Sequence, residues 1–160
     1  MKKDIKKTNA MRMLDKANVP YEVMEYEYDE NDLDGHHVAE FFGTAYEEVF
    51  KTLVTKGASG EYYVYCLNVD SEIDLKKAAA VAGEKRVEMI HVKELLPLTG
   101  YIRGGCSPVG MKKKFKTFFD EMIELIDVIY VSGGQRGVQL KLAPKDLLEY
   151  TEGVVADFTA

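Results

Sequence analysis

The sequence predicts an α/β (α+β) fold with a mixed, partly barrel-like β-sheet flanked by helices. The chain has 160 residues, of which 46% are hydrophobic and 30% charged, values typical of one globular domain. Segments with the period of strands are interspersed with segments of helical period, which indicates both hairpins and helical crossovers. No internal repeat, low-complexity stretch or linker interrupts the chain. We therefore expect residues 1–160 to form a single domain.

The first predicted elements follow from the spacing of apolar residues and from residues that typically begin or end helices. Thr8 can cap a helix that extends to about Ala17, and Pro20 prevents it from continuing. In the next strand, apolar and acidic residues alternate, which is typical of a half-buried position. The predicted strand, polar loop and two short helices cover, in order, residues 21–28, 29–35, 36–42 and 45–49.

The middle of the chain predicts a hairpin followed by a helix and a strand. The hairpin turn contains Gly57, Ser59 and Gly60, residue types that favour tight turns. Gly83 can end the helix in a left-handed conformation. The two hairpin strands, the helix and the last strand cover residues 49–56, 61–68, 74–82 and 86–91.

The last third begins with a loop over residues 99–110 that contains four glycines and one proline. We expect a helix over 117–125, because Phe118, Met122 and Leu125 would share one side of it. Pro144 is well placed to open the final helix, since proline fits the first helical position. The predicted strands between these two helices cover residues 127–132 and 138–143, and the final helix covers 144–150.

The charge is unevenly distributed. The formal net charge is −6, residues 21–50 carry ten acids and no Lys or Arg, and residues 111–116 read MKKKFK. An acidic chain is a poor candidate for a freestanding, high-affinity nucleic-acid binder, so any RNA contact should be local. We expect no DNA partner. Both charged segments can equally be ordinary solvated surface.

Targeting signals and metal motifs are missing from the sequence. The basic N-terminus lacks the apolar run of a signal peptide, and no segment reaches the ~20 apolar residues that span a bilayer. We therefore expect a cytoplasmic protein without a membrane partner. Cys66 and Cys106 form no CxxC pair, so neither a disulfide nor a metal site is supported. We expect no cofactor.

The candidate catalytic residues are few. His36 and His37 lie in an acidic loop, and His91 ends a predicted strand. A Ser–His–Asp or Cys–His triad remains possible, because its members need not be close in sequence. No GxSxG or HExxH motif marks one, so an ordinary surface histidine is the preferred interpretation of each.

Lys51 lies in a strand that should have a buried face, and by alternation it shares a side with Leu53. A lysine that faces a pocket from a sheet is a point charge suited to a phosphate or carboxylate. The alternative is a lysine whose stem covers an ordinary strand face.

Two glycine-rich segments, TGYIRGGCSPVG at 99–110 and SGGQRG at 132–137, could let backbone approach a ligand closely. Their N–H groups could hold an anion or a developing oxyanion. Both segments can also be structural turns.

Taken together, these segments resemble the YbaK family, also called EbsC-type, which is related to the editing domain of bacterial prolyl-tRNA synthetases. The resemblance rests on the combination of FKT at 50–52, TGYxxGGxSPxG at 99–110 and SGGxRG at 132–137. It extends over nearly the whole chain, from TNAMRML to the PKDLL of the last helix. The fold it implies is the YbaK and prolyl-tRNA synthetase editing-domain fold.

The resemblance implies a pocket that receives the 3′ end of a mischarged tRNA. The residues that match the family's motifs are Tyr26, Lys51, Thr52, Gly104, Gly105, Ser107, Ser132, Gly133, Gly134 and Arg136. Lys51, Gly104 and Gly105 are expected to act in catalysis and the others to bind substrate. Cys106 stands where the family more often has an aliphatic residue, so it is not expected to be a nucleophile.

The function implied is a trans-editing aminoacyl-tRNA deacylase that acts on mischarged tRNA(Pro), with Cys-tRNA(Pro) as the preferred substrate. In the family's cysteine-specific members the substrate's own thiol attacks its ester, so the protein needs to supply no nucleophile. The implied partners are the tRNA(Pro) acceptor end and prolyl-tRNA synthetase. The alternative is a non-catalytic regulatory protein that uses the same pocket to bind a nucleotide or an amino acid.

Overall fold

The computed structural model describes residues 6–160, so the first five residues of the basic N-terminal stretch lie outside it. The helices and strands are, in chain order, α1 (Asn9–Lys16), β1 (Glu22–Glu25), α2 (Gly35–Phe42), η1 (Tyr46–Glu48), β2 (Phe50–Gly57), β3 (Tyr62–Asn68), α3 (Leu75–Ala82), β4 (Val87–Met89), α4 (Val92–Thr99), β5 (Lys116–Asp120), η2 (Glu121–Leu125), β6 (Ile129–Ser132), β7 (Val138–Leu142), α5 (Pro144–Thr151) and β8 (Val154–Ala156).

The strands form two sheets, one mixed and one antiparallel. The five-stranded sheet has the order β4-β2-β3-β5-β8, and the three-stranded sheet has the order β1-β7-β6. The β2–β3 hairpin is antiparallel, whereas β5 pairs with both β3 and β8 in parallel. A parallel bridge between Val49 and Tyr130 joins the two sheets. The predicted mixed architecture is therefore confirmed, with the strands divided between two linked sheets.

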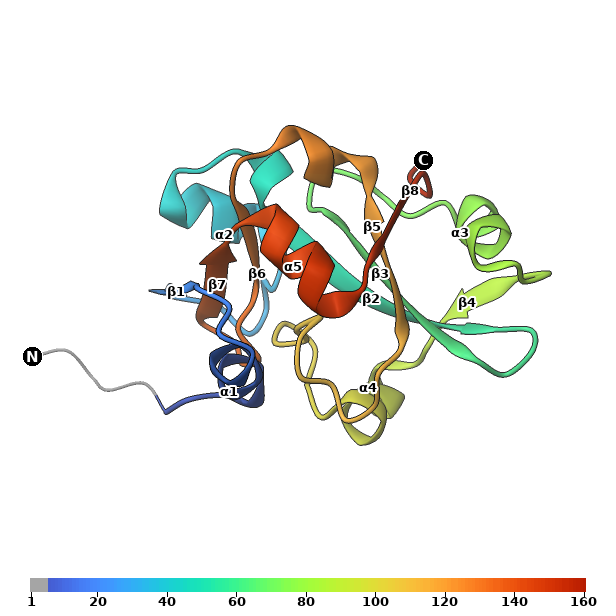
Figure 1. The fold of residues 1–160 in the computed structure, drawn as a ribbon, viewed down its shortest axis with the longest axis horizontal. Coiled ribbons are helices and arrows are strands. Elements are labelled where there is room, and N and C mark those ends of the chain that lie inside the picture. Colours follow the sequence, from blue (N-terminus) through green and yellow to red (C-terminus); the bar gives the residue numbers. More distant parts are fainter. Residues whose placement is uncertain (1–5) are drawn as a thin grey trace, which may run out of the picture.

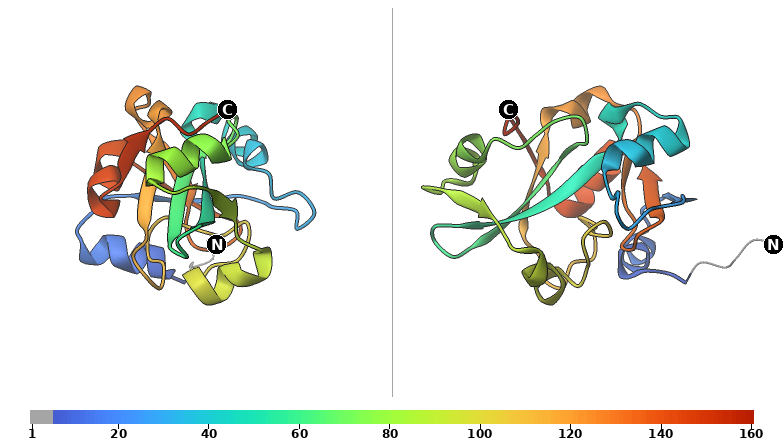
Figure 2. Two further views of the ribbon diagram at one scale, coloured as in Figure 1. Left: turned by 90° about the vertical axis from the view of Figure 1, so that its right-hand side faces the viewer. Right: turned by 180° about the vertical axis from the view of Figure 1, so that it is seen from behind.

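The two sheets lie at different places along the molecule (Figure 1). The three-stranded sheet with α1 and α2 is at one end, and α3 with β4 is at the other, as the views in Figure 2 also show. The main core lies between the sheets and contains Leu14, Phe119 and Leu140, which are fully buried. A second cluster joins α2 to the outer face of the three-stranded sheet through Val38, Ala39 and Tyr130.

The helix ends follow the signals in the sequence. The Thr8 Oγ1 accepts a hydrogen bond from the Met11 N–H at 3.3 Å, which confirms Thr8 as the first cap. Gly83 ends α3 with a φ of 73°, a left-handed conformation that glycine adopts without strain. Among the described residues no helix is long and apolar enough to cross a membrane.

The prediction of a helix over residues 117–125 is wrong. That segment forms strand β5 followed by the short helix η2. Phe118 and Phe119 are adjacent and 1% and 0% exposed, because β5 lies between two other strands with both faces covered, and such strands appear as continuous apolar runs. Helix α4 and strand β8 were not expected from the sequence.

Candidate active site

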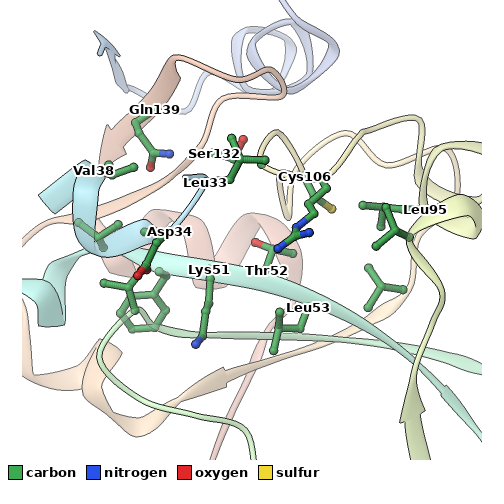
Figure 3. A pocket seen from close by; sticks show the side chains of 18 of the residues that line it. Leu33, Asp34, Val38, Lys51, Thr52, Leu53, Leu95, Cys106, Ser132 and Gln139 are labelled. Carbon is green, nitrogen blue, oxygen red and sulfur yellow. The ribbon is translucent and has the colours of Figure 1, made fainter. Parts of the chain in front are cut away.

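A cavity of about 370 Å³ lies beside β2, where the two sheets meet. Its walls come from β2, the start of α2, the segment from β4 into α4, the loop at 103–106 and the facing ends of β6 and β7. Figure 3 shows lining side chains on both sides of β2, with Thr52, Cys106 and Ser132 on one side and Lys51 and Leu53 on the other. Five of the residues expected at the site line this cavity: Tyr26, Lys51, Thr52, Gly104 and Ser132.

The cavity exists because one backbone edge of β2 is only partly paired. Strand β4 pairs with β2 from Thr55 onward, and the Val54 carbonyl accepts the last hydrogen bond, from the Ile90 N–H at 3.3 Å. Backbone groups two residues apart in a strand face the same edge. The N–H and C=O of Thr52 therefore face the cavity from an edge that no described strand covers at this point.

Lys51 and Thr52 point to opposite sides of β2. Figure 3 shows Lys51 on the same side as Leu53, and Thr52 on the side of Cys106, which agrees with the alternation expected from the sequence. Lys51 is half-buried and forms no ion pair with the described residues. Its charge lies close enough to Asp34 to contribute to the lowered pKa of that carboxyl group. The ammonium is thus free to bind an anionic or hydroxyl group on the side of β2 that Leu53 faces.

Gly104 and Gly105 differ in what their N–H groups can do. The Gly105 N–H donates to the Ile102 carbonyl at 2.9 Å and closes a turn. Gly104 lines the cavity with a φ of 83°, and its N–H donates to no acceptor in the described part of the chain. Within this turn the Gly104 N–H, and not that of Gly105, is the one that finds no acceptor among the described residues.

The second glycine-rich loop packs directly against the first. A Cβ on Gly105 would lie 3.0 Å from the Gln135 Cα, so the two backbones touch. The Arg136 Nε donates to the Arg103 carbonyl at 2.9 Å. Arg136 therefore joins the loops and does not line the cavity. Ser132, at the end of β6, is the residue of this loop that does.

The other matched residues act within the loops. The buried Ser107 Oγ accepts a hydrogen bond from the Val109 N–H at 3.2 Å. The Gly133 carbonyl accepts one from the Thr8 hydroxyl at 2.5 Å. A Cβ on Gly134 would approach Thr8 and Tyr101 to 3.1 Å. The structure places Ser107, Gly133 and Gly134 behind the cavity wall.

Tyr26 forms part of the wall just after β1. Its N–H donates to the Gly137 carbonyl at 2.9 Å, which fixes it to the second glycine-rich loop. Its ring packs edge-on against Phe42, with the ring centroids 5.9 Å apart. Tyr26 is therefore held from both its backbone and its ring.

Both cysteines are free and buried, as expected for Cys66 in its strand. Cys106 lines the cavity, and burial raises the pKa of its thiol to about 12. A thiol is a nucleophile only as the thiolate, and near neutral pH Cys106 is protonated. Burial thus disfavours the reactive form of Cys106, and its exclusion as a nucleophile stays a prediction.

Asp34 lines the cavity and caps α2, but no motif or spacing in the sequence singles it out. The His36 N–H, 3.0 Å from its Oδ1, holds the pKa of Asp34 below the usual range. The His36 ring lies between two carboxylates, 2.8 Å from Asp34 and 3.2 Å from Asp70, and their hydrogen bonds raise the pKa of His36. His36 thus links the cavity wall to the loop after β3.

The groups that could act in the cavity are charged side chains and backbone hydrogen-bond donors. Among residues 6–160, no three His, Cys, Asp or Glu side chains gather into a metal-binding group. The residues that line the cavity carry an unpaired lysine ammonium, a carboxylate, a backbone N–H without an acceptor in the described residues, and small hydroxyls. Such an arrangement suits the positioning of a reactive ester and stabilisation of an oxyanion.

Comparison with known proteins agrees with this arrangement. Residues 34–150 match the family described as "Aminoacyl-tRNA editing domain". The chain is 46% identical to the Enterococcus faecalis protein named "Putative Cys-tRNA(Pro)/Cys-tRNA(Cys) deacylase EbsC", over 99% of this chain and 96% of that protein. It is also 26% identical to a proline–tRNA ligase of Brachyspira hyodysenteriae, over 80% of this chain and 24% of the ligase.

The fold itself also occurs in solved structures. The structure described as "a putative trans-editing enzyme for prolyl tRNA synthetase" superimposes with a TM-score of 0.83 and 24% identity, over 95% of each chain. At that identity the likeness establishes the fold alone. The family to which the chain belongs is established by the match to the family and by the relative that is 46% identical over nearly its whole length. The chain therefore belongs to the family of aminoacyl-tRNA editing domains and, within it, to the EbsC-type proteins.

Proposed function

We propose that this protein is a trans-editing aminoacyl-tRNA deacylase, with residues 1–160 as one catalytic domain. Its substrate is mischarged tRNA(Pro), above all Cys-tRNA(Pro), the first of the two substrates in the name of its Enterococcus faecalis relative. The observation that carries the proposal is a cavity with a free Lys51 ammonium, a free Gly104 N–H and a protonated Cys106 thiol. This set can orient an ester without contributing a nucleophile.

In the proposed reaction the cysteinyl group supplies its own nucleophile. Its thiol loses a proton, and the sulfur forms a bond to the ester carbonyl carbon. The carbon–oxygen bond to the ribose then breaks, and the ribose oxygen takes up a proton. The resulting cyclic thioester reacts with water and gives free cysteine. Holding the two reacting groups together can supply several kcal/mol of barrier reduction.

Each proposed role follows from where the residue lies. The Lys51 ammonium holds a phosphate or hydroxyl group of the terminal adenosine. The Gly104 N–H donates to the oxyanion that develops on the carbonyl. Thr52, Tyr26 and Ser132 contact the aminoacyl-adenosine, and the loops that contain Gly105, Ser107, Gly133, Gly134 and Arg136 fix the wall around it.

The proposed partners are the acceptor end of tRNA(Pro) and prolyl-tRNA synthetase. With a net charge of −6 the protein alone should bind the tRNA phosphates weakly. A synthetase that already holds the tRNA would supply the missing affinity, and this reaction belongs to the cytoplasm. A pull-down in which added synthetase fails to increase tRNA retention would contradict the partner.

The test is deacylation of tRNA(Pro) charged separately with cysteine, alanine and proline. We expect rapid loss of the cysteinyl ester, a spared prolyl ester, and no activity in Lys51→Ala. The matched control is Lys56→Ala, because Lys56 is an exposed lysine of the same strand that does not line the cavity. Full activity of Lys51→Ala would refute the role of Lys51. No loss of any ester, even with synthetase present, would favour the non-catalytic binding protein.

A further inference from the structure

Gln139 is the buried polar residue of the cavity wall that the sequence motifs do not include. It lies in β7, paired with Ser132 on β6 and Met24 on β1. The residue is 5% exposed and lines the cavity. Figure 3 shows its side chain directed into the cavity, between Val38 and Ser132.

The surroundings of Gln139 would suit an apolar residue. Val138 and Leu140 point to the main core, so Gln139 lies on the opposite face of the sheet. Helix α2 covers that face with Val38 and Ala39, which pack with Met24 and Tyr130. An amide at this position is taken out of water among aliphatic and aromatic side chains.

The amide oxygen of Gln139 has no hydrogen-bond partner. It is the buried side-chain polar atom of the described residues for which no donor is found. Leaving a buried acceptor unpaired destabilises the folded protein, and native proteins pair most such groups. A ligand that brings a donor into the cavity would remove this cost, and rotation about the last side-chain bond turns the oxygen toward it.

We propose that Gln139 is a substrate-binding residue whose amide oxygen accepts a hydrogen bond from an amino group of the aminoacylated adenosine. The proposal rests on the deacylase function. Two amino groups of that substrate have the required chemistry, the α-amino group of the amino acid and the exocyclic amino group of adenine. In apolar surroundings such a hydrogen bond strongly favours substrates that carry the amino group over those that lack it, because a substrate without the donor leaves the acceptor unpaired.

The first test separates binding from structure by replacing Gln139 with methionine, which has a similar length and no amide. We expect kcat/KM for Cys-tRNA(Pro) to fall roughly tenfold, which is the loss of one hydrogen bond. We expect the melting temperature to stay the same or rise, because an unpaired buried acceptor has been removed. The control is Gln135→Met, an exposed glutamine in the neighbouring turn, which should leave both quantities unchanged.

The second test identifies the amino group that Gln139 binds. One substrate carries a 3-mercaptopropionyl ester, in which a hydrogen atom replaces the α-amino group and the thiol remains. The other ends in purine riboside, which lacks the exocyclic amino group. The substrate without the partner group should be hydrolysed equally by wild type and Gln139→Met, whereas the other should keep the tenfold difference.

Two results would overturn this inference and leave the deacylase intact. One is wild-type activity of Gln139→Met on Cys-tRNA(Pro) in an assay where Lys51→Ala is inactive. The other is a tenfold loss that persists on both modified substrates. If the wild-type protein hydrolyses no ester at all, the proposed function fails instead, so the two failures are distinguishable.

Discussion

The Nε of Arg136 donates a hydrogen bond to the backbone carbonyl of Arg103 at 2.9 Å. The two residues are 33 positions apart in the chain, one in each glycine-rich loop. Arg103 and its neighbour Gly104 line the cavity, whereas Arg136 does not. The second loop thus holds the first in place through a charged donor, and the position of the Gly104 N–H depends on that bond.

Arg136→Ala should therefore reduce catalysis without removing any group that lines the cavity. We expect kcat for Cys-tRNA(Pro) to fall several-fold, and the free energy of unfolding to fall by no more than about 1 kcal/mol, because the hydrogen bond that is lost is exposed. Steady-state kinetics and urea unfolding measure the two effects. Arg86→Ala, which removes an exposed arginine paired with Glu88, is the control. An unchanged kcat would show that the Arg103 carbonyl needs no such donor.

Gly105→Ala should destabilise the protein by crowding. The new Cβ would lie 3.0 Å from the Gln135 Cα and 3.2 Å from the Arg136 nitrogen, both backbone atoms, so we expect a loss of about 1–3 kcal/mol together with lower activity. Gly60→Ala is the comparison, because its φ of 94° costs about 1 kcal/mol in open space far from the cavity. Thermal melts and deacylation assays of both variants should show activity loss in Gly105→Ala alone.

Cys106→Ala should leave most of the activity. Burial raises the pKa of the Cys106 thiol to about 12, so its thiolate is scarce at neutral pH and cannot act as the nucleophile. We expect a kcat/KM within about threefold of wild type and slow alkylation of the wild-type protein by iodoacetamide. Loss of deacylation in a variant that still melts cooperatively would restore Cys106 as a candidate nucleophile.

His36 should make stability depend on pH. Hydrogen bonds to Asp34 and Asp70 raise the pKa of His36 above its unfolded value of 6.5, so the folded protein binds the proton more tightly than the unfolded chain. The resulting stabilisation is complete below the unfolded pKa and is lost as the pH rises through the folded pKa. The melting temperature should therefore fall more steeply above about pH 6.5 in wild type than in His36→Gln. Parallel curves for the two proteins would contradict the prediction.

Local signals predicted most of the elements. Thr8, Gly83 and Pro144 begin or end helices as expected, because capping depends on a few neighbouring residues. The error at 117–125 has a physical cause, since Phe118 and Phe119 are buried on opposite faces of β5 and their spacing carries no strand period. Which faces are covered depends on β3 and β8, and local sequence cannot supply that information.

The candidate site was only partly predictable for the same reason. The motifs placed Lys51, Thr52 and Gly104 at one cavity, and alternation predicted the side of β2 that Lys51 occupies. Gln139 could not be found in this way, because VQLKL has the pattern of a strand with one solvated face. Only the tertiary position of α2 covers that face and turns an ordinary glutamine into a buried, unpaired one.

Strand β8 bears on how the chain folds during synthesis. It pairs in parallel with β5, and the adjoining Phe158 is 0% exposed and accepts a hydrogen bond at its carbonyl from the Asp74 N–H. These contacts join residues more than 30 positions apart, and non-local parallel pairing is slow to form. The five-stranded sheet cannot be completed until residue 156 has left the ribosome. Until then one edge of β5 is unpaired. During this interval nascent chains are most prone to associate with one another through that edge.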